Sequence, residues 1–287
     1  MGVAASHVHA VRLRGHADLL ENSGAAMSTA QPAVWFTIND SGNDPVLFAF
    51  DTTGSPRGSW RINGARNVDW ESVSYGPCDG SSSAARCVYI GDTGDNEATA
   101  TSRSIYRVLE PRAFGNRSRD TLSAGKLTYH YPDGPHDVEA MYVAPDASIY
   151  LITKRPLIDS QGNLRRALLF RLPADAWSAK GVQVAALVDS LPIVPGSAFA
   201  RLVTDAALSP DARYLAVRTY TQVYVFAADP SSGRPIATVA PAICNVAPLD
   251  ERQGEGVTWL GSTRRLVFTT EGRSEPIRIA ECPLPRQ

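Results

Sequence analysis

Two neighbouring segments read Asn67-Val-Asp-Trp-Glu-Ser-Val-Ser-Tyr75 and Cys87-Val-Tyr-Ile-Gly-Asp-Thr-Gly-Asp-Asn96. In the first, apolar and polar residues alternate behind a pair of carboxylates, Asp69 and Glu71. The second is β-rich and ends in a run of Gly, Asp and Asn. Alternation predicts a half-buried strand, and a Gly/Asp/Asn run predicts a turn. The two segments therefore predict a strand with an acidic start, a return strand and an acidic loop.

The same unit recurs five times along the chain of 287 residues. Four of the five copies open with a polar or acidic residue, and each copy continues as a short alternating strand and reaches a turn. The copies cover Glu21–Met27, Asp69–Tyr75, Asp137–Val143, Val203–Ser209 and Gln253–Trp259. The third residue of each copy, which we call the hub position, is Ser23, Glu71, Glu139, Asp205 or Glu255.

Further β-rich segments follow each copy, and turn residues separate them. Fourth strands are predicted at residues 58–62, 126–130, 182–188 and 235–239. Four short strands in a repeat of this size are typical of a β-propeller blade. We predict one all-β domain over residues 1–287, a five-bladed β-propeller with blades near 21–66, 67–135, 136–200, 201–250 and 251–287. Hub positions 66 and 68 residues apart leave a six-bladed propeller as the alternative.

The fifth repeat ends after its third strand, close to the C-terminus. The N-terminal segment 7–14 alternates between apolar and polar residues and has no place in the other blades. Sheets with an exposed edge are prone to pair with other chains. We therefore predict that this segment adds the missing strand and closes the ring.

Charge and hydropathy exclude several classes of protein. The net charge is −1 and charged residues make up 20% of the chain, so neither a nucleic acid nor a membrane is expected as a partner. No run of 18 apolar residues predicts a transmembrane helix. Residues 1–6 lack the apolar core of a signal peptide, and the sequence is expected to begin at the mature protein. The oligomeric state is left open.

Cysteine usage points to an oxidising compartment. The four cysteines show no Cys-x-x-Cys pair and no His at ligand spacing, which argues against zinc. Of the three pairings that four cysteines allow, we favour Cys78–Cys87, which closes a Gly/Ser-rich loop, with Cys244–Cys282 joining the last two repeats. Four reduced thiols are the alternative. Disulfides predict a secreted or periplasmic protein.

The hub positions are expected to meet at one end of the propeller channel, because the first strand of each blade lines it. Around a narrow axis that also holds one hydroxyl, four carboxylates raise one another's pKa values unless a cation is bound. An all-oxygen set favours Ca²⁺ over a transition metal. We predict a Ca²⁺ site formed by Ser23, Glu71, Glu139, Asp205 and Glu255. The alternative is that these side chains cap the channel through water and backbone amides.

The second strands run back antiparallel and should end at the same mouth, where their loops carry both charges. We predict catalytic roles for Asp92, Asp95, Lys154, Arg155 and Arg218, and substrate binding by Asp40, Asp44, Tyr220, Glu271 and Arg273. The cations would bind an anionic group, and Asp92 or Asp95 would act as a general base or hold a second ion. The alternative for each loop is turn chemistry, since Asp, Asn and Gly form tight turns alone.

Five motifs carry a resemblance to known proteins: Asp69-Trp-Glu71, Gly91-Asp-Thr-Gly-Asp-Asn96, Asp137-Val-Glu-Ala140, Thr204-Asp-Ala-Ala-Leu-Ser-Pro-Asp211 and Gln253-Gly-Glu-Gly256. Together they resemble a family of largely uncharacterised bacterial β-propellers, over about residues 21–273. The hub also resembles that of the calcium-activated nucleotidases (apyrases), five-bladed propellers whose central Ca²⁺ is held by Ser and Glu residues. Asp205 departs from that pattern, because the family tends to have Ser there. The nucleotide-base contacts of that family are not recognisable, so its substrate is not implied.

Two functional hypotheses follow. The first is a secreted, calcium-binding, metal-dependent hydrolase that acts on a phosphorylated or otherwise anionic small molecule at the channel mouth. The second is a non-enzymatic binding or scaffold propeller in which Ca²⁺ holds the blades together, since the fold supports both roles. Glycan hydrolysis by paired carboxylates is a third hypothesis.

Overall fold

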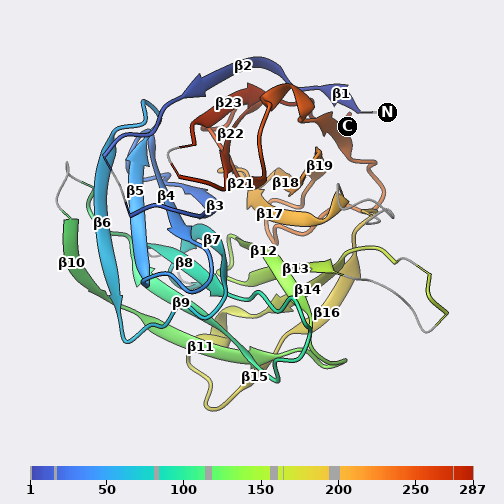
Figure 1. Cartoon of the computed structure of the whole chain (residues 1–287). Coiled ribbons are helices and arrows are strands. Elements are labelled where there is room, and N and C mark those ends of the chain that lie inside the picture. The colour runs from blue at the N-terminus through green and yellow to red at the C-terminus, as the bar shows by residue number, and fades with distance from the viewer. Residues whose placement is uncertain are drawn as a thin grey trace.

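Five small sheets stand around a central axis in the computed structural model (Figure 1), which describes residues 2–15, 18–80, 84–113, 118–155, 161–163, 165–193, 201–273 and 275–286. Each sheet begins with an inner strand and steps outward through antiparallel neighbours. The fold is a five-bladed β-propeller, as the repeats predict. No sixth sheet is formed by the described residues, so the six-bladed alternative is wrong.

The four main strands of each blade follow in order from the axis outward. Blade 1 contains β3 (Asn22–Met27), β4 (Val34–Asn39), β5 (Val46–Asp51) and β6 (Pro56–Asn63). Blade 2 contains β7 (Trp70–Pro77), β8 (Arg86–Asp92), β9 (Arg103–Leu109) and β11 (Gly125–His130). Blade 3 contains β12 (Asp137–Val143), β13 (Ile149–Arg155), β14 (Leu168–Leu172) and β16 (Ala186–Ser190). Blade 4 contains β17 (Val203–Leu208), β18 (Tyr214–Thr219), β19 (Gln222–Ala227) and β20 (Ala242–Asn245).

Blade 5 is completed by the N-terminus, as predicted. It contains β21 (Gly254–Trp259), β22 (Arg265–Thr270), β23 (Ile277–Glu281) and then β2 (Ser6–Val11), which pairs antiparallel with β23. The preceding strand, β1 (Val3–Ala4), pairs in parallel with β20 of blade 4. The two termini therefore lie close together, and the N-terminal segment joins the fourth blade to the fifth (Figure 1).

Two other blades also receive an outer strand from the next blade along the chain. Strand β10 (Ser118–Ser123) runs parallel to β6, and β15 (Gln183–Val184) runs parallel to β11. The single strand predicted at 182–188 is thus divided between blades 2 and 3. These outer strands cover edges that would otherwise be open.

The prediction of a fourth strand at residues 235–239 is wrong. Pro235 makes only an isolated bridge with Ala228, and a turn follows. The strand forms later, at β20, where Cys244 is bonded to Cys282 and the N-terminus adds β1. Two short 3-10 turns, η1 (Ala174–Trp177) and η3 (Ala247–Leu249), interrupt the β structure.

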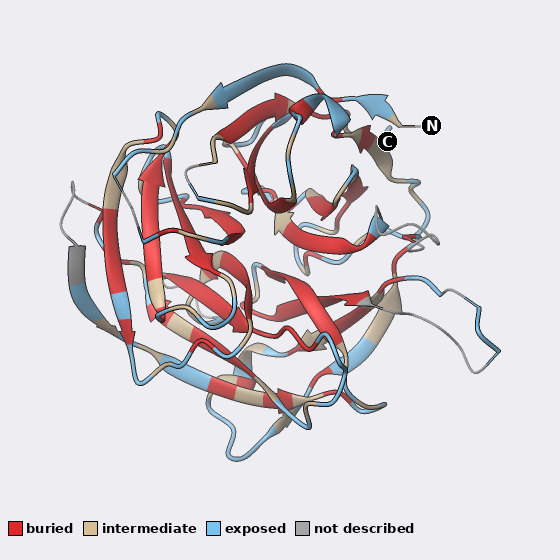
Figure 2. Cartoon of the chain, in the orientation of Figure 1, coloured by how far each residue is buried: buried red, intermediate tan, exposed pale blue. Residues whose placement is uncertain are grey.

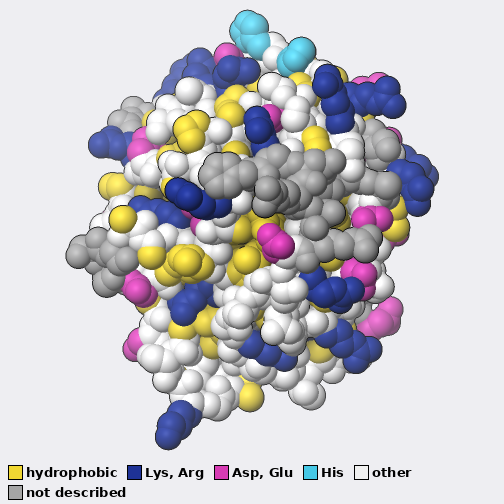
Figure 3. Space-filling model, turned by 90° about the vertical axis from the view of Figure 1, so that its left-hand side faces the viewer, with side chains coloured by type: hydrophobic (Ala, Val, Ile, Leu, Met, Phe, Trp, Pro, Cys, Tyr) yellow, Lys and Arg dark blue, Asp and Glu magenta, His cyan; other side chains and the backbone are white. Residues whose placement is uncertain are grey.

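The hydrophobic core consists of five layers, each between two adjacent blades. Phe36 and Trp60 of blade 1, for example, pack with Trp70 and Tyr106 of blade 2. Both faces of the inner strands are therefore covered, and three of these strands, β3, β12 and β21, are buried along their whole length (Figure 2). Basic and acidic side chains are interspersed over the side of the molecule that Figure 3 shows.

All four cysteines are paired, in the predicted pattern. Cys78 is bonded to Cys87 within blade 2, with an S–S distance of 2.04 Å, and Cys244 to Cys282 across blades 4 and 5, at 2.07 Å. Such pairs fit an oxidising compartment. Within the described part of the chain, no helix has the length and hydrophobicity needed to cross a membrane.

Candidate functional site

The five inner strands begin at the same end of the channel, which we call the acidic mouth. All five ladders between the first and second strands have a register shift close to this end. In blades 2 and 3 the unpaired residue is Glu71 or Glu139 itself, and in blade 5 it is Glu255 with Gly256. Because a β-bulge turns a side chain away from strict alternation, these bulges set where the three glutamates point.

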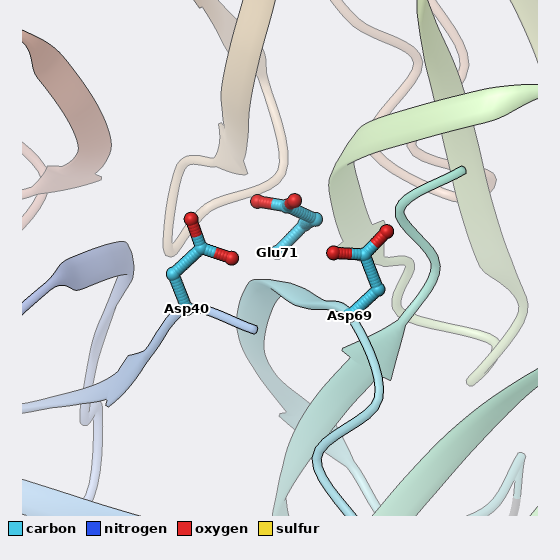
Figure 4. Close-up of side chains that lie close together, drawn as sticks. All are labelled: Asp40, Asp69 and Glu71. Atoms are coloured by element: carbon cyan, nitrogen blue, oxygen red, sulfur yellow. The ribbon is translucent and has the colours of Figure 1, made fainter. Parts of the chain in front are cut away.

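Three carboxylates meet at this mouth: Asp40, Asp69 and Glu71, which we call the carboxylate cluster. Each offers an oxygen that lies within 4.8 Å of the oxygens offered by the other two, and Figure 4 shows the three groups turned toward one another. Asp40 follows β4 of blade 1, whereas Asp69 and Glu71 stand at the start of β7 in blade 2. The cluster therefore lies between two blades and involves one hub residue.

Backbone contacts hold the cluster in place. The Asn67 side-chain amide donates to the carbonyls of Asn39 (3.1 Å) and Asp40 (2.7 Å). The backbone N–H of Asp69 donates to Asp92 Oδ1 at 2.7 Å. A Cβ added at Gly94 would lie 2.7 Å from Cγ of both Asp69 and Glu71. Only glycine lets this loop approach the cluster so closely.

The carboxylates of the cluster are buried and have few partners for a negative charge. Burial is the main cause that raises the pKa of Asp69 to about 6, and repulsion from Asp40 raises this pKa further. Burial likewise raises the pKa of Glu71 well above its ordinary value, again helped by Asp40. No hydrogen bond joins the Asp69 carboxylate to another described residue, and the nearest polar partner of Glu71 is the Ser23 hydroxyl, 3.5 Å from Oε2. These oxygens are available to a ligand.

Other acidic groups lie close by. Burial raises the pKa of Glu255 to about 7, although one of its oxygens accepts a hydrogen bond from Gln253 Nε2 at 2.8 Å. Burial also raises the pKa of Glu271, which the Asp40 charge raises further. Lys154 provides positive charge near these acidic groups. It forms an ion pair with Glu139, and its ammonium nitrogen lies 5.7 Å from the Tyr220 ring centroid. The second oxygen of Glu139, Oε2, is buried without a hydrogen-bond partner.

Two hub residues, Asp205 and Ser23, bond to backbone groups of neighbouring blades. The Asp205 carboxylate accepts hydrogen bonds from the backbone N–H groups of Val257 (2.8 Å), Ala25 (3.2 Å) and Ala206 (2.8 Å). Ser23 donates its hydroxyl to the carbonyl of Glu71 at 2.8 Å. Asp205 thus links blade 4 to blades 5 and 1 through backbone amides. The five-residue Ca²⁺ ring stays a prediction.

Arg218 does not reach the mouth, contrary to the prediction that it contacts a substrate there. Its side chain is 0% exposed, and it donates to the carbonyls of Gly256 (2.6 Å) and Thr269 (3.0 Å) and pairs with Glu251. A guanidinium enclosed in this way holds blade 4 against blade 5. Sequence reasoning missed its partner Glu251, which lies outside every motif.

Asp92 and Asp95 hold turns. Asp92 accepts from the Asp69 backbone, as described above, and Asp95 accepts from the N–H groups of Thr99 (3.1 Å) and Ala100 (2.8 Å). Asp95 also pairs with Arg103 at 3.0 Å. Turn chemistry, the alternative interpretation of these residues, accounts for the bonds from Thr99 and Ala100, whereas the Asp95 backbone N–H donates to Asp137 Oδ1 of blade 3 at 2.9 Å. The catalytic roles of Asp92 and Asp95 stay a prediction.

The remaining predicted residues are scattered. Asp44 is exposed and pairs with Arg61 at 2.8 Å, so it lies outside the cluster. Arg273 is exposed, and Tyr220 faces Lys154. Arg155 ends β13, and its side chain lies outside the described residues. Sequence reasoning noted Asp69 but did not include it among the ligands, although its place two residues before Glu71 was the available signal.

No protein-family model matches the chain, and no curated protein matches it. A solved structure of a luciferin-regenerating enzyme is similar over 96% of this chain and 98% of that one, with 10% sequence identity and a TM-score of 0.46. This likeness carries no argument about activity. The resemblances to the bacterial propeller family and to the calcium-activated nucleotidases stay predictions.

Proposed function

We propose that the protein is a secreted β-propeller that binds Ca²⁺ at its acidic mouth, where the ion joins blade 1 to blade 2. The carboxylate cluster carries this proposal, because Asp40, Asp69 and Glu71 come from both blades and place their oxygens within 4.8 Å of one another. Ca²⁺ prefers carboxylate, carbonyl and water oxygens and tolerates irregular geometry. The residues present fit such an ion, since no His or Cys lies among them.

Electrostatic repulsion supports the same proposal. Two carboxylates about 4.8 Å apart repel each other by roughly 3 kcal/mol at an effective dielectric constant of about 20. The pKa values of all three groups are raised, with burial as the largest cause. A divalent cation would relieve the repulsion and allow all three to ionise at neutral pH. The ion would thereby stabilise the contact between the two blades.

The test is a calcium titration of Asp69→Asn, with Asp44→Asn as the matched control. Asp44 is exposed and pairs with Arg61, away from the cluster. After treatment with EGTA, Ca²⁺ should raise the melting temperature of the wild-type protein and of Asp44→Asn. Asp69→Asn should melt higher than the wild type without Ca²⁺, because one charge is removed, and should gain little from Ca²⁺. If Ca²⁺ raised the melting temperature equally in all three proteins, the proposal would be overturned.

Hydrolysis of an anionic small molecule is the second candidate function. Lys154 favours this second function. The positive charge of its ammonium group offsets part of the rise that burial causes in the pKa values of Glu71 and Glu255. Bound Ca²⁺ would supply a Lewis acid to polarise an anionic group. Purified protein with Ca²⁺ should then hydrolyse a nucleotide, a phosphoester or a lactone, and Lys154→Met should lose that turnover. If no substrate of the three classes is hydrolysed, the scaffold role remains.

A further inference from the structure

A cavity of about 340 Å³ lies at the opposite end of the channel, which we call the far mouth. All five inner strands contribute their last residues to it, which are Met27, Pro77, Val143, Leu208 and Trp259. Ligand pockets in proteins have volumes of roughly 300–1,000 Å³. The cavity is therefore large enough for a small organic molecule, and it is separate from the carboxylate cluster at the strand heads.

Small residues keep this end of the channel open. Ala25 and Ala26 of blade 1, Gly76 of blade 2, and Ala206 and Ala207 of blade 4 line the cavity. The Asp205 carboxylate, which directly precedes Ala206, bonds to the backbone of blades 1 and 5. These cross-links fix the inner strands directly beneath the cavity, so the space is formed by a rigid part of the fold.

The aromatic residues of the wall have their polar atoms already bonded. Tyr142 donates its hydroxyl to the carbonyl of Gly233 at 3.1 Å, and Trp259 donates its indole N–H to the carbonyl of Ala207 at 2.9 Å. The Tyr75 hydroxyl donates to Glu110 at 2.8 Å. Tyr142 and Trp259 are 1% and 2% exposed, so a ligand would meet the half-buried lining residues instead, such as Tyr75, Ala207 and Leu208.

One charged side chain stands among the described residues that line the cavity: Arg86, the first residue of β8. Its side chain has one long hydrogen bond in the described structure, from Nη1 to the carbonyl of Ala85 at 3.4 Å, and no described carboxylate forms an ion pair with it. Arginine binds carboxylate and phosphate groups through two parallel N–H donors. Positive charge at the wall of a cavity of this size favours a small organic anion.

We propose that the far mouth binds a small organic anion, with an aromatic or aliphatic body beside Ala207 and Leu208 and its anionic group on Arg86. This site is independent of the cation proposed for the acidic mouth. The cavity, its small-residue lining and the single guanidinium carry the inference together.

Two probes of the same shape and opposite charge test the proposal: 1-naphthoate and 1-naphthylmethylamine. Calorimetric titration of the full chain should give binding of the carboxylate and at least tenfold weaker binding of the amine. Arg86→Gln should weaken naphthoate binding about tenfold. Arg265→Gln is the matched control, because Arg265 is the exposed first residue of the second strand in blade 5 and does not line the cavity. It should bind naphthoate as the wild type does.

A second variant tests the position of the ligand. Ala207 is half-buried at the cavity wall, and Ala207→Phe would fill the space and should abolish naphthoate binding. Melting curves of each variant confirm that it is folded, and EGTA should leave naphthoate binding unchanged. Equal binding of the acid and the amine, or undiminished binding by Arg86→Gln or by Ala207→Phe, would overturn the proposal.

Discussion

Replacing Glu255 with glutamine should stabilise the protein at neutral pH when Ca²⁺ is absent. Glu255 is 6% exposed, and one of its oxygens accepts from Gln253 at 2.8 Å. Burial is the main cause that raises the pKa of this carboxyl from 4.5 to about 7. Glutamine has nearly the same shape and keeps an acceptor for Gln253. It carries no charge that folding must remove from water.

The raised pKa fixes the sign and the pH range. The folded protein binds this proton more tightly than the unfolded chain, so the free energy of unfolding falls as the pH rises from about 4.5 to about 7. One pKa unit corresponds to about 1.4 kcal/mol, so a rise from 4.5 to about 7 costs roughly 3 kcal/mol at neutral pH. Glu255→Gln should therefore exceed the wild type by about that amount at pH 8 and approach it at pH 4.

Urea unfolding in EGTA at several pH values between 4 and 8 measures this difference. The control is Glu97→Gln, since Glu97 is an exposed loop residue, and its pH profile should match the wild type. Added Ca²⁺ should reduce the advantage of Glu255→Gln, because a nearby cation favours the ionised carboxylate. A Glu255→Gln variant with the wild-type pH profile, or one less stable than the wild type at pH 8, would refute the reasoning.

Three further substitutions test single contacts. Gly94→Ala should lower Ca²⁺ affinity at least tenfold by calorimetry, because its Cβ would lie 2.7 Å from two cluster side chains; unchanged affinity would contradict the packing argument. Arg218→Met should cost roughly 3–5 kcal/mol in urea unfolding, since Glu251 would remain buried without its partner; a loss under 1 kcal/mol would contradict a structural role. Cys244→Ser with Cys282→Ser should cost about 4 kcal/mol, because the disulfide closes a loop of 38 residues; an unchanged urea midpoint would show that the ring holds without it.

The fold could be predicted from the sequence because each blade repeats the same pattern. Alternation at Asp69–Tyr75 and its four copies gives the inner strands, and the missing strand of the last repeat points to the N-terminus. The outer strands were harder to predict. Pro235–Val239 has a β-rich composition, yet the chain turns there and pairs at Ala242–Asn245. Outer strands have one neighbour fewer, so contacts distant in sequence decide their position.

The candidate site was predicted less completely, because the side chains at equivalent positions have different neighbours. The repeats place Glu71, Asp205 and Arg218 near one channel end, but the structure encloses the Arg218 side chain between blades 4 and 5. What each one contacts depends on bulges and on residues outside the motifs. Arg218 meets Glu251, which precedes the fifth copy of the repeated unit and lies outside every motif, and becomes fully buried. Alternation alone cannot show this, since a bulge changes the direction of a side chain without changing its position in the repeat.

Side-chain length and loop geometry together favour a cation site away from the five-fold axis. Asp205 is short, lies among three strands and satisfies its carboxylate with backbone N–H groups. Glu139 pairs with Lys154, and this ion pair occupies the part of the mouth beside blade 3. Around blades 1 and 2 the loops place Asp40 and Asp69 beside Glu71, with no described cation paired to any of the three. Repulsion is therefore least compensated between those two blades, and a divalent cation bound there would stabilise their contact most.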